Sequence, residues 1–223
     1  MIKSRTVQII YQSIYIGISF IAILASFGLF DMSFRWDFYI HFTNISNFLC
    51  ILIMLIELKD TVNKKQDDYV RTLLLLKFIA LLSISLTFIV YNFLLSSTRD
   101  AKDSFTVGSV TLHIILPIMF TFDYILFYEH GKIKWYYPII STIFPLAYAI
   151  FVFMHAAIRK FDSSILCFDK TVPLIYPYFF LNIEKLGIDA VIKNIIIITV
   201  VFIIFGYIIM IIDKFLSKIK RTF

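Results

Sequence analysis

The stretch "AVIKNIIIITVVFIIFGYIIMII", residues 190–212, is almost entirely apolar and is long enough to cross a lipid bilayer. A helix rises about 1.5 Å per residue and a bilayer core is about 30 Å thick, so roughly 20 residues are needed. Lys193 is its one charged residue and lies near one end, where a long side chain can reach the membrane surface. The stretch therefore predicts a transmembrane helix.

Similar apolar segments recur along the rest of the chain. The chain is 60% hydrophobic, whereas soluble domains are about 45–50% apolar, and its mean hydropathy is +0.88. The apolar runs are continuous rather than alternating, which favours helices over a β-barrel. We therefore expect an all-α, polytopic membrane protein, with residues 1–223 forming a single domain built as a six-transmembrane-helix bundle. The other expected spans are residues 8–30, 38–58, 72–95, 107–128 and 135–157.

Positive charge is distributed unevenly between the connecting pieces. If both termini are cytoplasmic, the cytoplasmic pieces carry more Lys and Arg than the outer ones, and the positive-inside rule favours that orientation. We therefore expect both termini in the cytoplasm. The net charge of +6 is explained by basic inner loops facing anionic lipid, so it does not indicate nucleic-acid binding.

Charged residues inside the spans are few. Lys77 lies near the end of its span, so we expect its ammonium group to extend to the surface. Asp123 is expected near the cytoplasmic interface as a structural group. No polar stripe carries a paired set of charges, so the sequence does not indicate a proton relay or an ion path.

The chain lacks the usual spacings of a metal or cofactor site. Cys50 and Cys167 are expected at different depths, so a disulfide between them is not expected. No HxxxH, HExxH or CxxC spacing occurs. His113 and His155 have the matched depth that haem ligation needs, but His130 has no partner for a second haem at the opposite depth. We expect no metal and no cofactor.

Polar residues open the second span, in "YIHFTNISNFLC" (39–50), where hydrocarbon would suit a membrane better. Thr43 and Asn47 are four residues apart and share one helix face. The rise per residue places Thr43 roughly 8 Å, and His113 roughly 9 Å, below the outer ends of their spans. We expect them to line a polar or semi-polar cavity open toward the outer leaflet. The groups expected beside them, for substrate binding or oxyanion stabilisation, are Asn44, Asn47, Tyr91, Asn92, Tyr148 and His155.

The outer segment 158–189 contains "LIYPYFFLNI" (174–183), which is too apolar and aromatic for a solvated loop. Aromatic residues favour the membrane interface. The segment is either a lid over the cavity or an interfacial anchor, and the sequence leaves both open.

Thr43 and His113 together indicate one possible chemistry. A hydroxyl becomes a nucleophile when a base removes its proton, and imidazole is the usual base near neutral pH. The alternative is structural, because most threonines in membrane helices bond their own backbone and most single histidines only pack. Asp123 lies ten residues beyond His113, or about 15 Å along a helix, so it cannot orient that imidazole.

Three pieces of the chain, in order, resemble the six-span androgen-induced protein family, and more closely its bacterial branch. They are "HFTNISNF" (41–48), "LHIILPIMFTFDYILF" (112–127), and "FPLAYAIFVF" (144–153) with "YPYFFL" (176–181). Animal members are threonine hydrolases that cleave fatty acid esters of hydroxy fatty acids, with one essential Thr and one essential His. The resemblance implies these roles for Thr43 and His113.

Two functions follow as expectations. The first is an intramembrane hydrolase of lipid esters, with a Thr nucleophile and a His base. The alternative is a non-catalytic membrane protein that binds a lipid or another small molecule. In either case the expected partner is a membrane lipid or lipid ester, and the expected location is a bacterial plasma membrane. The sequence leaves the oligomeric state open.

Overall fold

The computed structural model describes residues 4–63, 70–95, 106–161 and 175–219, and this part of the chain is helical with no β-strand. The all-α expectation is confirmed. The long helices are α1 (Arg5–Phe27), α2 (Phe42–Asn63), α3 (Val70–Val90), α6 (Leu116–Phe127), α8 (Ile143–Phe161) and α10 (Ile188–Ile219). The short elements are η1 (Trp36–Ile40), η2 (Tyr91–Leu95), α5 (Val107–Val110), η3 (Thr111–Ile115), α7 (Tyr137–Ile140), η4 (Phe179–Leu181) and α9 (Ile183–Leu186).

Within the described residues, five helical stretches are long and apolar enough to cross a membrane. They indicate a membrane protein. α2 is not among the five, although it has 22 residues. Residues 38–40, expected at the start of the second span, belong instead to the separate turn η1. The five stretches are residues 5–27, 73–93, 107–127, 137–161 and 188–218.

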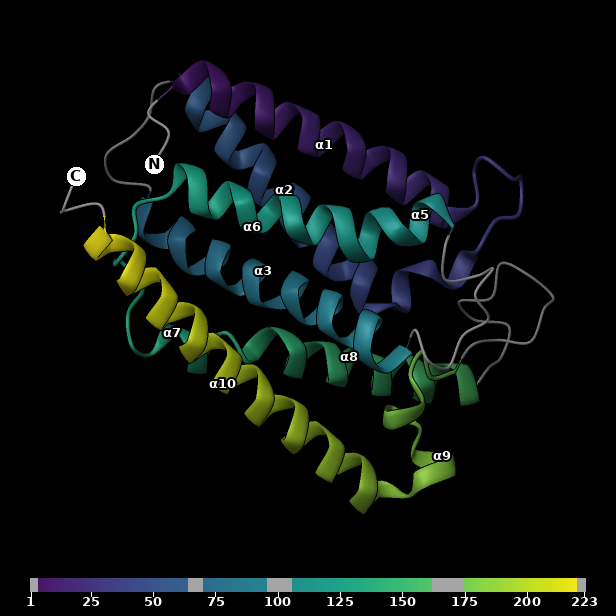
Figure 1. Cartoon of the computed structure of the whole chain (residues 1–223). Helices are drawn as coiled ribbons and strands as arrows, with labels where there is room; N and C mark the ends of the chain where they lie inside the picture. The colour runs from purple at the N-terminus through teal and green to yellow at the C-terminus, as the bar shows by residue number, and fades with distance from the viewer. Residues whose placement is uncertain (1–3, 64–69, 96–105, 162–174, 220–223) are drawn as a thin grey trace.

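The long helices pack side by side (Figure 1). α1 packs against α2 and α6, and α3 packs against both α2 and α6. α10 lies at the side of this group and contacts mainly α7, with fewer contacts to α8 and α3. The start of α1 and the end of α10 lie at the same end of the bundle, opposite the start of α2 (Figure 1).

A glycine allows the close approach of α10. A Cβ on Gly206 would lie 2.9 Å from the Cβ of Pro138 and 3.2 Å from Cδ1 of Leu82. Only hydrogen fits there without a shift of the neighbours. Gly206 therefore sets how closely α10 packs on α7 and α3.

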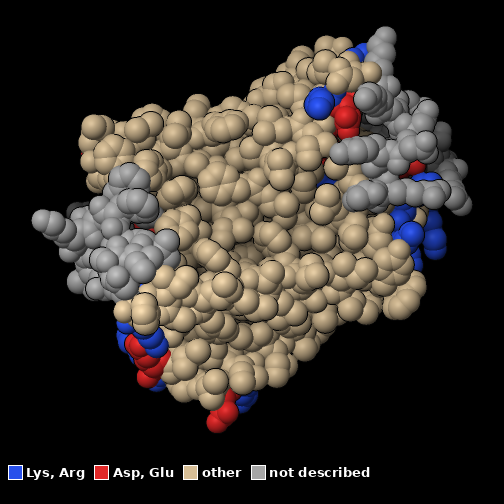
Figure 2. All heavy atoms as spheres, turned by 180° about the vertical axis from the view of Figure 1, so that it is seen from behind, with Lys and Arg blue, Asp and Glu red and all other residues tan. Residues whose placement is uncertain are grey.

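The surface carries a wide apolar band. On the face seen in Figure 2, the Lys, Arg, Asp and Glu atoms that are visible gather toward the two ends, and other residues cover the middle. Large apolar side chains on α1, α8 and α10 are more than half exposed, among them Ile21, Ile150 and Ile204. Because water would be a poor solvent for such a band, it matches a lipid environment.

The interior departs from expectation at three charged residues. Lys77 and Asp123 are fully buried, with side chains 0% exposed, and Lys77 Nζ lies 2.5 Å from Asp123 Oδ2. Lys77 also pairs with Glu57 at 3.0 Å. The predicted extension of Lys77 to the surface is therefore wrong, and its charge is paired across helices rather than along one polar stripe. The partners sit on three different helices, so no spacing within one helix reveals them.

Candidate functional site

The polar start of α2 is explained by contacts between elements. Asn44 Nδ2 donates to the Phe38 carbonyl at 2.5 Å and holds η1 against α2. Asn47 Nδ2 donates to the carbonyl of Thr43 at 2.8 Å and to that of Leu112 in η3 at 3.2 Å. These amides therefore join segments of the bundle, and in doing so they fix the first turn of α2, where Thr43 lies.

His113 lies in η3, a π-helical turn within the helical stretch 107–127. Such turns interrupt the regular ladder and are frequent at functional sites. His113 Nδ1 lies 2.8 Å from the Ser109 carbonyl oxygen. A carbonyl can only accept, so Nδ1 carries the hydrogen and Nε2 keeps its lone pair. That Nε2 lies 3.1 Å from Thr43 Oγ1.

Tyr91 covers one face of the His113 ring. The two rings are stacked, with centroids 3.8 Å apart and planes 21° apart. The Tyr91 hydroxyl pairs with Ser109 Oγ at 2.7 Å. Tyr91 begins η2, a second π-helical turn, at the end of α3. The imidazole is thus oriented by a carbonyl at its edge and by an aromatic ring on its face.

A cavity of about 80 Å³ adjoins Thr43. It lies between the start of α2, the end of α3, α8, α10 and the segment around η4. Within the described chain none of the lining residues is Asp, Glu, Lys or Arg, so the space suits an uncharged, largely apolar group. The lining residues are Phe42, Thr43, Leu86, Thr87, Val90, Tyr91, Pro145, Leu146, Tyr148, Ala149, Tyr178, Phe180, Leu181, Ile195, Ile198 and Thr199.

Of the expected site residues, Thr43, Tyr91 and Tyr148 line this cavity, whereas His113 lies behind Thr43 and Tyr91. The Tyr148 hydroxyl donates to the Ile40 carbonyl at 2.8 Å, so it braces the turn before α2.

The other expected residues are not part of the lining. Asn44 and Asn47 bond backbone carbonyls, as described above, and Asn92 Nδ2 donates to the Phe88 carbonyl of its own helix at 2.8 Å. His155 Nε2 lies 3.0 Å from the Tyr39 hydroxyl, away from Thr43. The convergence that depth alone predicts is therefore partial.

The aromatic outer segment reaches the cavity. Residues 162–174 of the 158–189 segment, with Cys167, lie outside the described residues. Beyond them, Tyr178, Phe180 and Leu181 line the cavity. The Tyr178 hydroxyl accepts from the Phe42 backbone N–H at 3.2 Å. This part of the segment forms one wall of the cavity beside Thr43.

The start of α2 also supplies a donor. Thr43 is in the first turn, where backbone N–H groups have no acceptor within the helix, and no acceptor for the Thr43 N–H occurs among the described residues. The positive end of the helix dipole lies at the same place. The sequence predicts Tyr178 only as part of the aromatic segment 174–183, and it does not reveal this N–H, which depends on where α2 begins.

No group of three or more His, Cys, Asp or Glu that could hold a metal occurs among the described residues. Comparisons of the whole chain with protein-family models, with curated protein sequences and with solved structures give no match in any of the three. The geometry of the site is therefore the basis on which a function can be proposed.

Proposed function

We propose that this chain is an intramembrane hydrolase of lipid esters, in which Thr43 is the nucleophile and His113 the general base. The observation that carries the proposal is the 3.1 Å contact between Thr43 Oγ1 and Nε2 of His113, beside an apolar cavity. A hydroxyl within hydrogen-bond reach of an oriented base is the arrangement that nucleophilic catalysis requires.

The first half-reaction forms an acyl-threonine. His113 Nε2 takes the Thr43 hydroxyl proton as Oγ1 attacks the ester carbonyl carbon, and the carbonyl oxygen becomes an oxyanion. The Thr43 backbone N–H and the α2 dipole would stabilise that charge. The bond to the leaving oxygen then breaks, and His113 returns the proton to it, which releases the alcohol.

The second half-reaction restores the enzyme. His113 Nε2 takes a proton from water, the hydroxide oxygen attacks the acyl carbon, and the bond to Thr43 Oγ1 breaks. Oγ1 regains the proton from His113. One ester and one water thus become one alcohol and one carboxylic acid, with no cofactor consumed. The resemblance noted above suggests fatty acid esters of hydroxy fatty acids as substrates.

The proposal includes six transmembrane helices and cytoplasmic termini in a bacterial plasma membrane. α2 has 22 residues, or about 33 Å at the usual rise, which matches a bilayer core of about 30 Å. Glu57 lowers its apolar character, but this carboxylate is paired inside the bundle. The excess of positive charge in the inner loops supports the orientation.

A non-catalytic lipid-binding protein is the second candidate. The amides of Asn44 and Asn47 already donate to backbone carbonyls, so they offer little to a substrate carbonyl. A cavity of about 80 Å³ is also smaller than the roughly 300 Å³ of common ligand pockets. Both observations favour binding of one part of a lipid chain without chemistry.

A fluorophosphonate probe distinguishes the two candidates. The purified full chain should be labelled, and Thr43→Ala should remove the label. Thr199→Ala is the matched control, because Thr199 lines the same cavity while its hydroxyl bonds the Ile195 carbonyl of its own helix at 2.8 Å. Absence of labelling in the wild type, with no turnover of a panel of lipid esters, would leave the binding protein.

A further inference from the structure

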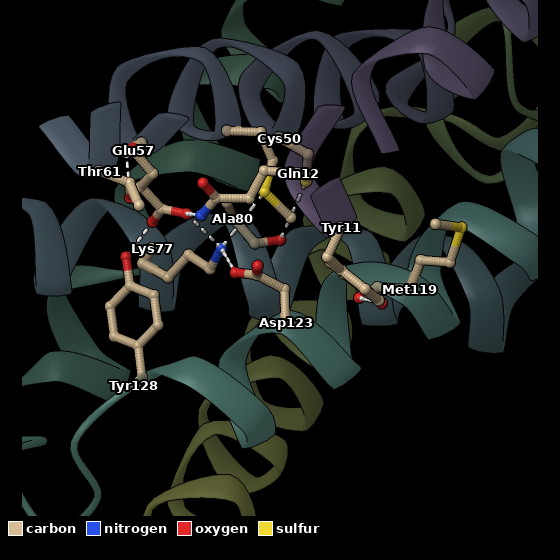
Figure 3. A network of polar contacts seen from close by, with 11 residues as sticks. Tyr11, Gln12, Cys50, Glu57, Thr61, Lys77, Ala80, Met119, Asp123 and Tyr128 are labelled. Carbon is tan, nitrogen blue, oxygen red and sulfur yellow. Dashed lines mark hydrogen bonds and ion pairs between the residues drawn. The ribbon is translucent and has the colours of Figure 1, made fainter. Parts of the chain in front are cut away.

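Three charged side chains from three helices meet in the interior (Figure 3). Lys77 of α3 extends between Asp123 of α6 and Glu57 of α2, at 2.5 Å and 3.0 Å respectively. The side chains of Lys77 and Asp123 are 0% exposed, and that of Glu57 is 5% exposed. The cluster is therefore separated from water and lies between the last two turns of α2, the last two turns of α6 and the first two turns of α3.

The neighbouring groups are neutral or aromatic. Gln12 Nε2 donates to Glu57 Oε2 at 3.5 Å, the Tyr128 hydroxyl donates to Glu57 Oε1, and Lys77 Nζ lies 4.0 Å from the centre of the Phe120 ring. The other titratable neighbours are Tyr11, whose hydroxyl donates to the Met119 carbonyl, Tyr15, and Cys50, whose Sγ faces the Ala80 carbonyl. None of these neighbours can supply a second positive charge.

Two oxygen atoms in the cluster have no hydrogen-bond partner within the described part of the chain. They are Asp123 Oδ1 and Gln12 Oε1, and both belong to residues that are 0% exposed. Leaving such acceptors unpaired in a low-dielectric interior is costly. They point to a ligand with hydrogen-bonding or positive character.

The charges do not balance when all three groups are ionised. Two carboxylates and one ammonium leave one uncompensated negative charge in the membrane interior, which is expensive. Two carboxylates at one site also disfavour each other's ionisation. A single positive charge would neutralise the cluster.

We infer that the Glu57–Lys77–Asp123 cluster is a proton-binding site, in which the pair of carboxylates holds one proton and the cluster as a whole is neutral. A metal ion fits poorly, because both Glu57 oxygens already accept from donors and the Lys77 ammonium occupies the space between the carboxylates. The proton belongs to the pair, since titrations coupled this closely are shared.

The inference does not depend on the proposed hydrolase. Asp123 is ten residues after His113, which corresponds to about 15 Å along a helix. The cluster and the Thr43 site thus lie at different levels of the bundle. A substitution that removes the cluster therefore need not change the Thr43 site, and a substitution at Thr43 need not change the cluster.

Infrared spectroscopy of the full chain in lipid nanodiscs tests the inference directly. A protonated carboxyl group has a C=O stretch distinct from that of a carboxylate. At about pH 8, where exposed Asp and Glu are ionised, we expect a signal equivalent to about one such group. Its absence from the wild type would overturn the inference.

Four variants assign the signal. Glu57→Gln and Asp123→Asn each leave one carboxylate opposite Lys77, so the signal should vanish in both. Lys77→Met leaves two carboxylates without a cation, so both should be protonated. The infrared signal should then rise to about twice its wild-type size. Glu129→Gln is the control, because that carboxylate is 65% exposed and its loss should change nothing.

Two further outcomes would contradict a proton site. A signal that persists in both Glu57→Gln and Asp123→Asn would come from another group. A wild-type protein without the signal, whose melting temperature rises with sodium at constant ionic strength, would hold a metal cation instead. If one variant fails to fold in size-exclusion chromatography, the wild type and the remaining isosteric variant still decide the question.

Discussion

Thr43 Oγ1 lies 3.1 Å from His113 Nε2, although the two residues are 70 positions apart in the chain. The contact joins the first turn of α2 to a π-helical turn near the start of the helical stretch 107–127. The opposite ring nitrogen of His113 is held by the Ser109 carbonyl. The orientation of the His113 imidazole is therefore set by a backbone carbonyl group rather than by a carboxylate.

Replacing the base should abolish the proposed chemistry without unfolding the protein. His113→Gln keeps a polar side chain at the site but provides no imidazole, so we expect fluorophosphonate labelling to be about 10²–10⁴ times slower. Labelling rates of purified wild type and variant, at equal folded fraction by size-exclusion chromatography, provide the measurement. His155→Gln is the matched control, since His155 pairs with Tyr39 instead of Thr43. Equal rates in wild type and His113→Gln would exclude His113 as the base.

The ring of Tyr91 should matter more than its hydroxyl. Tyr91→Phe keeps the ring that stacks on His113 and loses the hydroxyl that contacts Ser109. Tyr91→Leu loses the stacking, a contact of about 0.5–1.5 kcal/mol in aromatic pairs. We expect a lower thermal midpoint and slower labelling for Leu than for Phe. A Phe variant as impaired as the Leu variant would show instead that the hydroxyl orients the site.

Filling the cavity should block ligand entry. Ile198 lines the cavity, whereas Ile196, two residues earlier on α10, is 58% exposed on the apolar surface. Ile198→Trp should therefore reduce ester turnover or the binding of a fluorescent fatty acyl probe by at least about tenfold, the effect of losing about 1.4 kcal/mol. Ile196→Trp should behave like the wild type. If the two variants have the same effect, this cavity is not the binding site.

Gly206 should be the glycine least tolerant of substitution among those in long helices. Gly206→Ala places a Cβ against Pro138, and overpacking of this kind costs about 1–3 kcal/mol. Gly17→Ala is the control, because its Cβ would meet nothing within 4 Å, and it gains up to about 1 kcal/mol of helix propensity. Thermal unfolding in detergent should rank Gly17→Ala at or above the wild type and Gly206→Ala below it. The reverse order would contradict the packing described for α10.

The apolar spans could be predicted from local composition, because a stretch of about 20 apolar residues has few alternatives to a membrane helix. The start of α2 could not. Residues 38–40 are apolar enough to extend a span, but they form the separate turn η1, which Asn44 and Tyr148 hold through backbone carbonyls. Thr43 consequently lies in the first helical turn and not about 8 Å inside the span.

The contacts of single polar residues are harder to predict from the sequence than the spans are. Depth counting placed Thr43 and His113 at similar levels, and the structure brings them together. The same reasoning also grouped Asn92 and His155 with them, and these residues bond elsewhere. Depth gives one coordinate of a side chain, whereas the direction in which it points around the helix depends on packing.

The sequence by itself determined the helical class, the apolar spans and the candidate pair of a hydroxyl and an imidazole, because each follows from local composition or from position along one helix. Only the tertiary structure decided which side chains meet. The meeting of Thr43 with His113, the place of Tyr178 in the cavity wall and the burial of Lys77 between Glu57 and Asp123 all arise from contacts between segments distant in the chain. Which side chains pair depends on how the helices pack and on the cost of leaving polar groups unpaired away from water. The sequence of one segment contains no information on either.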